Sequence, residues 1–173
     1  MKRYFRAQFP DDNIEVKVEL LDQETPQTCE AFWRILEKPI ENNARHAVYV
    51  GRCIALRDSF TPEEVQRGLG GKTLIPPENL TCFPAPGDVL WVQFDKTTGR
   101  NRGSKPPNYQ INMFYGPDNR YLLPMGLLSL NCFARIRGWE TDPPTKNFED
   151  LAKIGRELAQ KGDKRVVFSR ITG

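Results

Sequence analysis

The sequence predicts a mainly β protein, a closed antiparallel barrel of about eight strands capped by two helices. Segments in which apolar and polar residues alternate recur along the 173 residues, as half-buried strands require. The 14 prolines fall mostly in pairs and turn contexts, which indicates many tight connections between strands. Two helical patterns lie far apart in the chain, an order that suits a helix over each open end of a barrel.

The first two strands are predicted to form an antiparallel hairpin. Residues 3–9 alternate with a period of two, and residues 14–20 alternate again with one charged face. The Pro-Asp-Asp-Asn segment between them, residues 10–13, is a turn signal.

A helix is expected over residues 26–36. Thr25 can cap it, and proline is tolerated at its first position because the missing donor would have no partner there. Cys29, Phe32 and Leu36 belong to one apolar stripe at helical spacing. Residues 46–56, which are rich in Val, Ile and Ala, are interpreted as the next strand.

Thr61 and Glu64 indicate the capped start of a short helix that the glycine pair at residues 70–71 stops. The proline-rich segment 84–88 is a tight turn. Residues 89–94 follow it and are apolar on both faces, which predicts a central strand.

Three further strands are expected over residues 110–115, 127–136 and 166–171. Before the last of them, Asn147 is expected to cap a helix that ends near Lys161. Because the sequence shows neither a repeat nor a linker, residues 1–173 are predicted to form one domain.

Composition argues against several functional classes. The net charge of +3 is spread along the chain, so no nucleic-acid partner is expected. The N-terminus shows no apolar signal region, and the longest uncharged stretch, residues 121–134, is too short to span a bilayer. We therefore expect a cytoplasmic protein with no membrane partner. The four cysteines lie far apart and His46 is the one histidine, so neither a metal site nor a cofactor is expected.

Several motifs resemble the cyclophilins. The Thr/Pro-led helix that starts after Thr25 and carries Phe32 is similar to the first helix of that fold, and residues 151–168 resemble its last helix and strand. The segments 46–51, 84–89, 114–116 and 126–134 are similar to a bacterial cyclophilin-like family of uncharacterised function. The resemblance implies a cyclophilin-like barrel along most of the chain.

The sequence departs from that family at three places. Gln110 and Arg52 stand where the family tends to be acidic, and a basic insertion at residues 96–105 replaces a short turn. These departures imply a changed ligand preference. The Phe-His-Arg motif of prolyl isomerases is absent, and the nearest basic pair, Arg45 and His46, has the reversed order. A prolyl isomerase or peptide-binding module is therefore an alternative rather than the main hypothesis.

Polar residues on otherwise apolar strands predict one shared pocket, because buried polar groups cost free energy unless they are paired. A cleft lined by His46, Tyr49, Asn112 and Tyr115 is expected, with the basic insertion at its rim as an anion clamp or lid. Each of these residues also has a structural alternative. His46 could hold a loop carbonyl, the asparagine amides could link strands, and the basic insertion could be a solvated hairpin tip. The predicted ligand-binding residues are His46, Tyr49, Arg52, Arg100, Arg102, Gln110, Asn112, Tyr115 and Asn131.

The expected function is the binding of a small polar metabolite that carries an amide or a carboxylate. The resemblance implies a catabolic context, because similar proteins accompany amide-metabolising enzymes. An enzyme that acts on a cyclic amide through His46 is the first alternative, with its catalytic residues unassigned. Homo-oligomerisation stays open.

Overall fold

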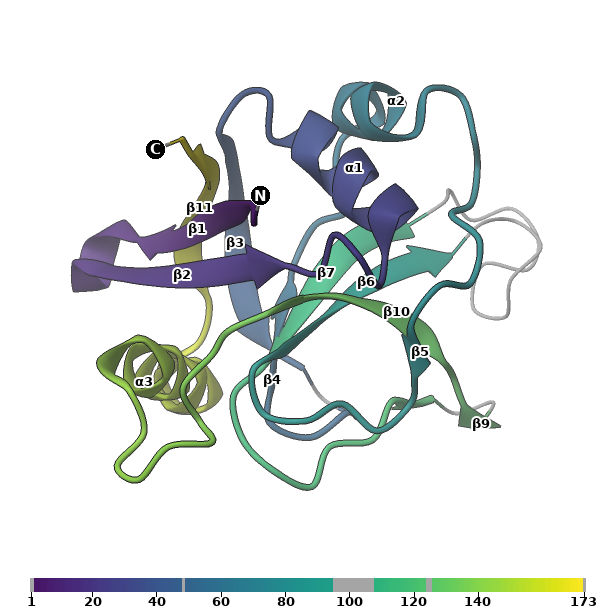
Figure 1. Ribbon diagram of the computed structural model, residues 1–173. Helices are drawn as coiled ribbons and strands as arrows, with labels where there is room; N and C mark the ends of the chain where they lie inside the picture. Colours follow the sequence, from purple (N-terminus) through teal and green to yellow (C-terminus); the bar gives the residue numbers. More distant parts are fainter. Residues whose placement is uncertain (1, 48, 95–107, 124–125, 173) are drawn as a thin grey trace.

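Eight strands close into a barrel in the computed structural model of the chain, which describes residues 2–47, 49–94, 108–123 and 126–172 (Figure 1). The strands are β1 (Tyr4–Phe9), β2 (Ile14–Leu20), β3 (Ile40–His46), β4 (Cys53–Leu56), β5 (Leu80–Thr81), β6 (Asp88–Phe94), β7 (Asn108–Phe114), β8 (Leu122–Leu123), β9 (Gly126–Leu127), β10 (Leu130–Arg135) and β11 (Lys164–Ile171). The helices are α1 (Pro26–Ile35), α2 (Pro62–Leu69) and α3 (Lys146–Lys161), with one 3-10 turn, η1 (Pro10–Asp12).

The ring runs in the order β2-β1-β11-β3-β4-β7-β6-β10, and β10 returns to β2. Every ladder of the ring is antiparallel. The closing contact is short, with Ala134 opposite Leu20 and Arg135 opposite Glu19. β5 pairs with β10 outside the ring. The predicted closed, mainly β barrel of about eight strands is confirmed.

The predicted N-terminal hairpin is β1 and β2. Phe5, Ala7 and Phe9 alternate inward with no exposed surface, as the period of two requires. The turn between the strands ends at Asn13, which adopts the left-handed conformation (φ 50°) that asparagine tolerates better than most residues.

The barrel interior is filled by an aromatic cluster around Phe32, which α1 inserts into it. The Phe32 ring centroid lies 4.9 Å from that of Phe5, 5.1 Å from that of Phe133 and 6.1 Å from that of Phe60. Trp91 of β6 stacks on Phe60 at 5.9 Å. Helix α1 is thus anchored to two strands of the barrel, β1 and β10, and to the connection between β4 and α2.

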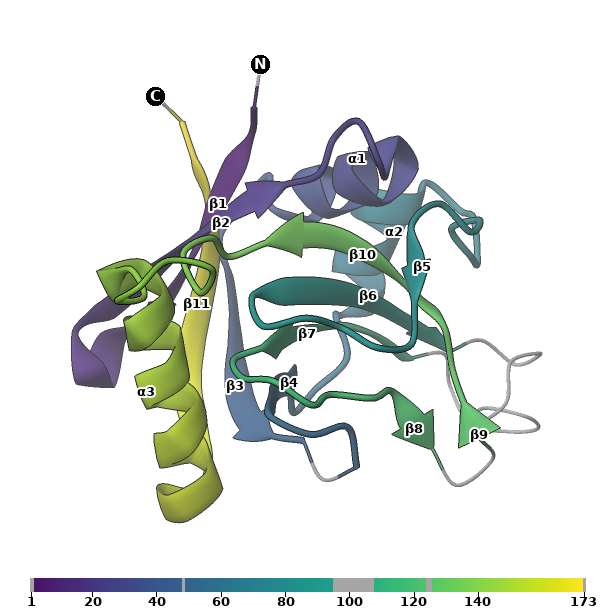
Figure 2. The same cartoon turned by 60° about the horizontal axis from the view of Figure 1, so that its bottom comes forward.

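β6 is buried on both faces, as its sequence predicts. Trp91 faces the interior, whereas Leu90 and Val92 face outward into a second apolar cluster that includes Phe114 and Tyr121. The polypeptide that contains β8 and β9 and the segment around β5 lie over this outer face (Figure 2).

The described residues hold three α-helices: the two longer ones predicted far apart in the chain and the short one predicted to start at Thr61. α2 is the short helix that Thr61 begins, and its capping box with Glu64 is present. It packs on α1 through Gly68, where a Cβ atom would lie 2.6 Å from Ile35. α3 packs against β2, β3 and β4, away from the other two helices (Figure 2). Among the described residues, none of the helices is long and apolar enough to cross a membrane.

The segment 46–56, predicted as one strand, is instead a hairpin. His46 is the last residue of β3, and β4 begins at Cys53. The chain turns between them at Gly51, whose φ of 95° favours glycine, and Ala47 donates its N–H to the carbonyl of Cys53 at 2.9 Å.

Neither predicted side-chain cap of the two longer helices forms. Thr25 donates its hydroxyl to the carbonyl of Leu21 at 3.1 Å, and α1 is capped by Glu78 from a distant loop. The Glu78 carboxylate accepts from the backbone N–H groups of Gln27 at 2.8 Å and Thr28 at 2.9 Å. It also accepts from the Thr28 hydroxyl at 2.6 Å.

Asn147 lies within α3 and bonds β2 rather than its own helix. Its Oδ1 accepts from the Lys17 N–H at 2.8 Å, and its Nδ2 donates to the Lys17 carbonyl at 2.9 Å. The side chain thereby fixes the start of α3 against the N-terminal hairpin.

Glu78→Ala should lower the free energy of unfolding by about 1–3 kcal/mol, because it removes a charged cap and leaves N–H groups of α1 without partners. Urea denaturation measures the loss. Glu63→Ala is the control: the Glu63 side chain is 79% exposed, and its removal should cost less than about 0.5 kcal/mol. Equal costs for the two variants would show that the distant cap contributes nothing.

All four cysteines are free, and three of them are buried. Burial raises the pKa of Cys29 and Cys132 to about 12 and that of Cys53 well above its usual range. Their reactive thiolate forms are therefore scarce at neutral pH.

At pH 8, a disulfide-exchange reagent should modify Cys82 quickly and the three buried thiols only after unfolding. Absorbance of the released thiol, with and without denaturant, counts both classes. Cys82→Ser should remove the fast phase. A fast phase of more than one thiol in the native protein would contradict the burial of the others.

Candidate functional site

His46 and Tyr115 meet where the barrel wall faces α3. His46 ends β3 and Tyr115 directly follows β7, and His46 Nε2 lies 2.8 Å from the Tyr115 hydroxyl. The two rings meet edge to face, with centroids 5.8 Å apart. The structure therefore brings two of the predicted ligand-binding residues into direct contact.

Gly155 lets Tyr115 press against α3. A Cβ atom at residue 155 would lie 2.3 Å from the Tyr115 ring, so only glycine leaves room for the tyrosine between helix and barrel. Tyr115 is 7% exposed, and the packing of its ring against Gly155 fixes the position of its hydroxyl beside the helix.

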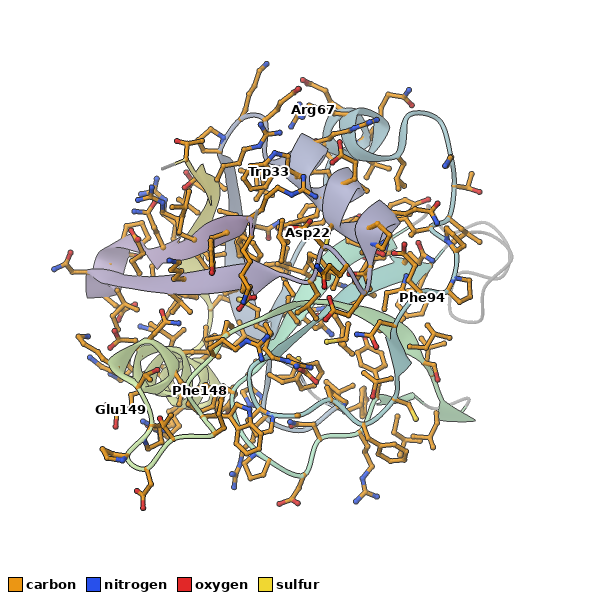
Figure 3. The ribbon with its side chains drawn as sticks, viewed as in Figure 1. Asp22, Trp33, Arg67, Phe94, Phe148 and Glu149 are labelled. Carbon is orange, nitrogen blue, oxygen red and sulfur yellow. The ribbon has the colours of Figure 1, made fainter. Side chains whose placement is uncertain are left out.

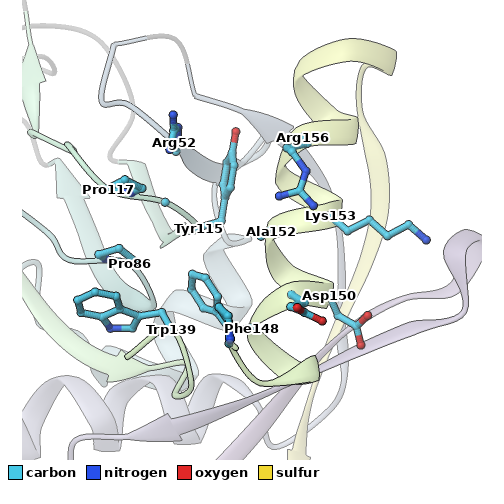
Figure 4. Close-up of a pocket in the computed structure, with 13 residues that line it drawn as sticks. Arg52, Pro86, Tyr115, Pro117, Trp139, Phe148, Asp150, Ala152, Lys153 and Arg156 are labelled. Carbon is cyan, nitrogen blue, oxygen red and sulfur yellow. The ribbon is translucent and has the colours of Figure 1, made fainter. Parts of the chain in front are cut away.

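Burial raises the pKa of the Tyr115 hydroxyl, and the positive charges of Arg52 and Arg156 oppose this rise. The net pKa lies above the ordinary value of about 10, so the hydroxyl keeps its proton at neutral pH. It remains able to donate a hydrogen bond, with an arginine on either side of it (Figure 4).

A groove of about 670 Å³ lies along α3, and Tyr115 lines it whereas His46 does not (Figure 4). Its two poles differ in chemistry. Arg52 and Arg156 lie at one end, and Pro86, Trp139 and Phe148 form the other, while Lys153 lines the groove from α3 with its side chain directed outward. The remaining residues that line it are Tyr115, Gly116, Pro117, Pro144, Glu149, Asp150 and Ala152. Phe148 and Glu149 come from the first turn of α3 (Figure 3).

The three cations of the groove have no ion-pair partner within the described part of the chain. Asp150, which also lines the groove, pairs with Lys146 at 2.6 Å, and Glu149 lines the groove without an ion pair among the described residues. The Arg52 side chain lies over Gly116, where a Cβ atom would come within 2.3 Å of Arg52 Cδ. Uncompensated guanidinium groups beside a hydroxyl donor form a site suited to an anion.

Asn112 lies on the opposite face of the barrel wall, which corrects the predicted shared cleft. It faces outward and donates its Nδ2 to the Tyr121 hydroxyl at 3.1 Å. Gln110 shares that outer face, and its Nε2 donates to Asn108 Oδ1 at 3.3 Å. The reason is the pleat: Asn112 and Tyr115 are an odd number of residues apart, so their side chains leave opposite faces.

Asn131 and Tyr49 are also outside the groove. Asn131 accepts from the Glu78 N–H at 2.9 Å and donates to the Thr28 hydroxyl and the Pro76 carbonyl, so it holds the loop that caps α1. Tyr49 is 61% exposed and does not line the groove. Arg100, Arg102 and the basic insertion to which they belong lie outside the described residues.

Arg156, Lys153, Trp139 and Phe148 were not predicted as site residues. Lys153 and Arg156 are three apart on α3, which places them on one face, but such spacing is ordinary for a solvated helix surface. Only the packing of α3 against the barrel shows that this face borders a groove.

The fold and the groove together define this chain as a closed antiparallel β-barrel protein with an anion-suited groove beside its last helix. A solved structure described as McbB in complex with tryptophan has a similar fold, with a TM-score of 0.65 and 12% sequence identity. The match covers 98% of this chain and 46% of that one, so this chain spans about half the length of McbB. No curated protein matches the sequence.

The chain belongs to the DUF3830 family, described as a protein of unknown function, whose family model matches residues 8–169.

Proposed function

We propose that this protein binds a small metabolite bearing a carboxylate or an amide in the groove beside α3. One observation carries the proposal: Arg52 and Arg156 flank Tyr115, whose hydroxyl is hydrogen-bonded to His46, and neither arginine has a counter-ion in the described part of the chain. Guanidinium groups bind carboxylates through paired hydrogen bonds, and this arrangement offers such bonds next to a hydroxyl.

His46 sets the direction of the Tyr115 hydroxyl. When Nε2 carries the imidazole proton, it donates to the tyrosine oxygen, and the tyrosine O–H is free to donate to a ligand oxygen. When Nε2 is unprotonated, it accepts the tyrosine proton, and the tyrosine oxygen accepts from a ligand N–H instead. The pair can therefore donate a hydrogen bond to a carboxylate or an amide oxygen, or accept one from an amide N–H.

A thermal-shift screen of monocarboxylates, dicarboxylates and primary amides tests the proposal. Tryptophan joins the panel because the similar McbB structure holds it. A ligand of the folded state should raise the melting temperature by several degrees at 100 times its Kd. Arg52→Met should abolish the shift. Arg45→Met is the matched control, because Arg45 leaves the opposite face of β3 from His46. Equal shifts in the two variants would contradict the proposed site.

His46→Ala should weaken the binding of any compound found in this screen about tenfold, through loss of one oriented hydrogen bond. It should change the melting temperature of the empty protein little, because His46 is only half-buried. Titration calorimetry and thermal unfolding measure the two effects. An equal loss of stability with and without ligand would instead make His46 a purely structural residue.

We also propose that the barrel is cyclophilin-like, on the strength of the order of the cyclophilin-like motifs along the chain. An enzyme on a cyclic amide is the second candidate function, favoured by the 2.8 Å contact between His46 and Tyr115, which provides a path for a proton. Conversion of such an amide by the wild-type protein, lost in Tyr115→Phe, distinguishes this candidate from simple binding.

A further inference from the structure

The apolar pole of the groove contains an indole with an open surface. Trp139 is 42% exposed, one of few large apolar side chains so exposed in the described residues. It stands with Pro86 and Phe148 at the end of the groove away from Arg52 and Arg156 (Figure 4). A partly exposed tryptophan in a concave site is a common platform for a ligand ring.

The backbone that leads into Trp139 is fixed at Gly138. Gly138 has a φ of 107°, and a Cβ atom there would lie 1.9 Å from the Thr145 hydroxyl, while its carbonyl accepts from the Thr145 N–H at 2.9 Å. The Trp139 ring approaches the Gly87 turn, with Cδ1 3.5 Å from the position of a Cβ atom on Gly87. The backbone that carries the indole is therefore held in place before any ligand arrives, which lowers the entropic cost of binding.

We infer that the ligand of this groove is an aromatic monocarboxylate, whose ring lies on Trp139 and Phe148 and whose carboxylate lies between Arg52 and Arg156. This inference rests on the proposed function and adds the ligand class to it. The groove volume of about 670 Å³ lies in the range of sites that bind drug-sized molecules, and one continuous groove is lined by both the arginines and Trp139.

The charges of the groove favour one negative charge over two. Glu149 and Asp150 line the same groove as the cations and repel a dianion such as a phosphate monoester. Lys146 pairs with Asp150 and offsets part of this repulsion, whereas Glu149 has no ion pair among the described residues. A single carboxylate meets the arginines without bringing a second charge near Glu149.

Three compounds distinguish the contributions of the two ends of the groove to affinity: 3-phenylpropionate, propionate and 3-phenylpropanol. Each Kd is measured by NMR titration, which reaches millimolar affinities. We expect 3-phenylpropionate to bind at least tenfold more tightly than either of the others, because it alone uses both poles. The intrinsic fluorescence, to which Trp33 and Trp91 also contribute, should change with 3-phenylpropionate and not with propionate, and Trp139→Phe should remove the change.

Two substitutions assign the poles. Trp139→Ala should weaken 3-phenylpropionate about tenfold and leave propionate unchanged, whereas Arg52→Met should weaken both acids. Phe83→Ala is the matched control, since Phe83 is an aromatic residue that is 63% exposed and lies outside the groove. Trp139→Phe keeps a ring and should restore most of the affinity. Thermal unfolding of each variant shows that it is folded.

The outcomes distinguish the inference from the function on which it rests. Equal affinities for propionate and 3-phenylpropionate, with no effect of Trp139→Ala, would overturn the aromatic ligand and leave an anion site at Arg52. Binding of 3-phenylpropanol as tight as that of the acid, with no effect of Arg52→Met, would overturn both. The absence of binding by all three probes would also overturn both.

Discussion

Phe32→Ala should lower the free energy of unfolding by about 3–5 kcal/mol. Phe32 has no exposed surface, and its ring contacts those of Phe5, Phe60 and Phe133. These three rings come from β1, from the connection between β4 and α2, and from β10, so they cannot all collapse into the vacated space and a cavity remains. Urea denaturation, followed by circular dichroism, measures the loss.

The control for Phe32 is Phe83→Ala, which removes a phenyl group that is 63% exposed and should cost less than about 0.5 kcal/mol. A loss below about 1 kcal/mol for Phe32→Ala would mean that α1 is not anchored by this ring.

Gly87→Ala should cost about 3 kcal/mol, from backbone strain and a steric collision together. Gly87 has a φ of 88°, and a Cβ atom there would lie 2.2 Å from the Ile136 carbonyl oxygen. The collision is with backbone that cannot turn aside, because the Ile136 N–H donates to the Gly87 carbonyl at 2.8 Å and the Gly87 N–H donates to the Phe114 carbonyl at 2.7 Å. The same turn supports Trp139, so the substitution should also weaken ligand binding.

Gly71→Ala separates the two causes. Gly71 has nearly the same φ, 89°, but a Cβ atom there has no neighbour within 4 Å among the described residues. It should show the strain alone, about 1 kcal/mol. The difference between the two variants, measured by urea denaturation, is the cost of the collision. Identical losses would show that the close approach at Gly87 relaxes freely.

Local patterns were sufficient to predict the elements whose burial follows from their own residues. The N-terminal hairpin follows from the alternation of apolar and polar residues in β1 and β2. The burial of β6 on both faces follows from the absence of such alternation. β3 was missed because Glu41, Asn42 and Asn43 carry polar side chains toward solvent and toward neighbouring strands, so the segment lacks an apolar pattern. The two predicted helix caps were wrong for another reason. The residue that caps α1, Glu78, and the residue that Asn147 binds, Lys17, are both remote in sequence.

The site was only partly predictable. His46, Tyr115 and Arg52 were among the predicted residues, and the structure places them together or in one groove. The assignment of Asn112 to the same cleft overlooked that an odd separation from Tyr115 reverses the face of a strand. Arg156 and Trp139 come from elements whose position against the barrel depends on tertiary packing, which no local pattern encodes.

The pairing of β1 with β11 has a consequence for how the chain folds. Tyr4 lies opposite Ile171, so the first strand obtains one of its two neighbours only when the last strand has been made. Until then the hairpin of β1 and β2 presents an unpaired edge, open to wrong partners. Contacts of such sequence separation carry a large loop-closure entropy, which places the folding of barrels in the range of about milliseconds to seconds. During synthesis, ring closure therefore has to wait until β11 has been made, and β11 is the strand whose truncation should leave the chain aggregation-prone.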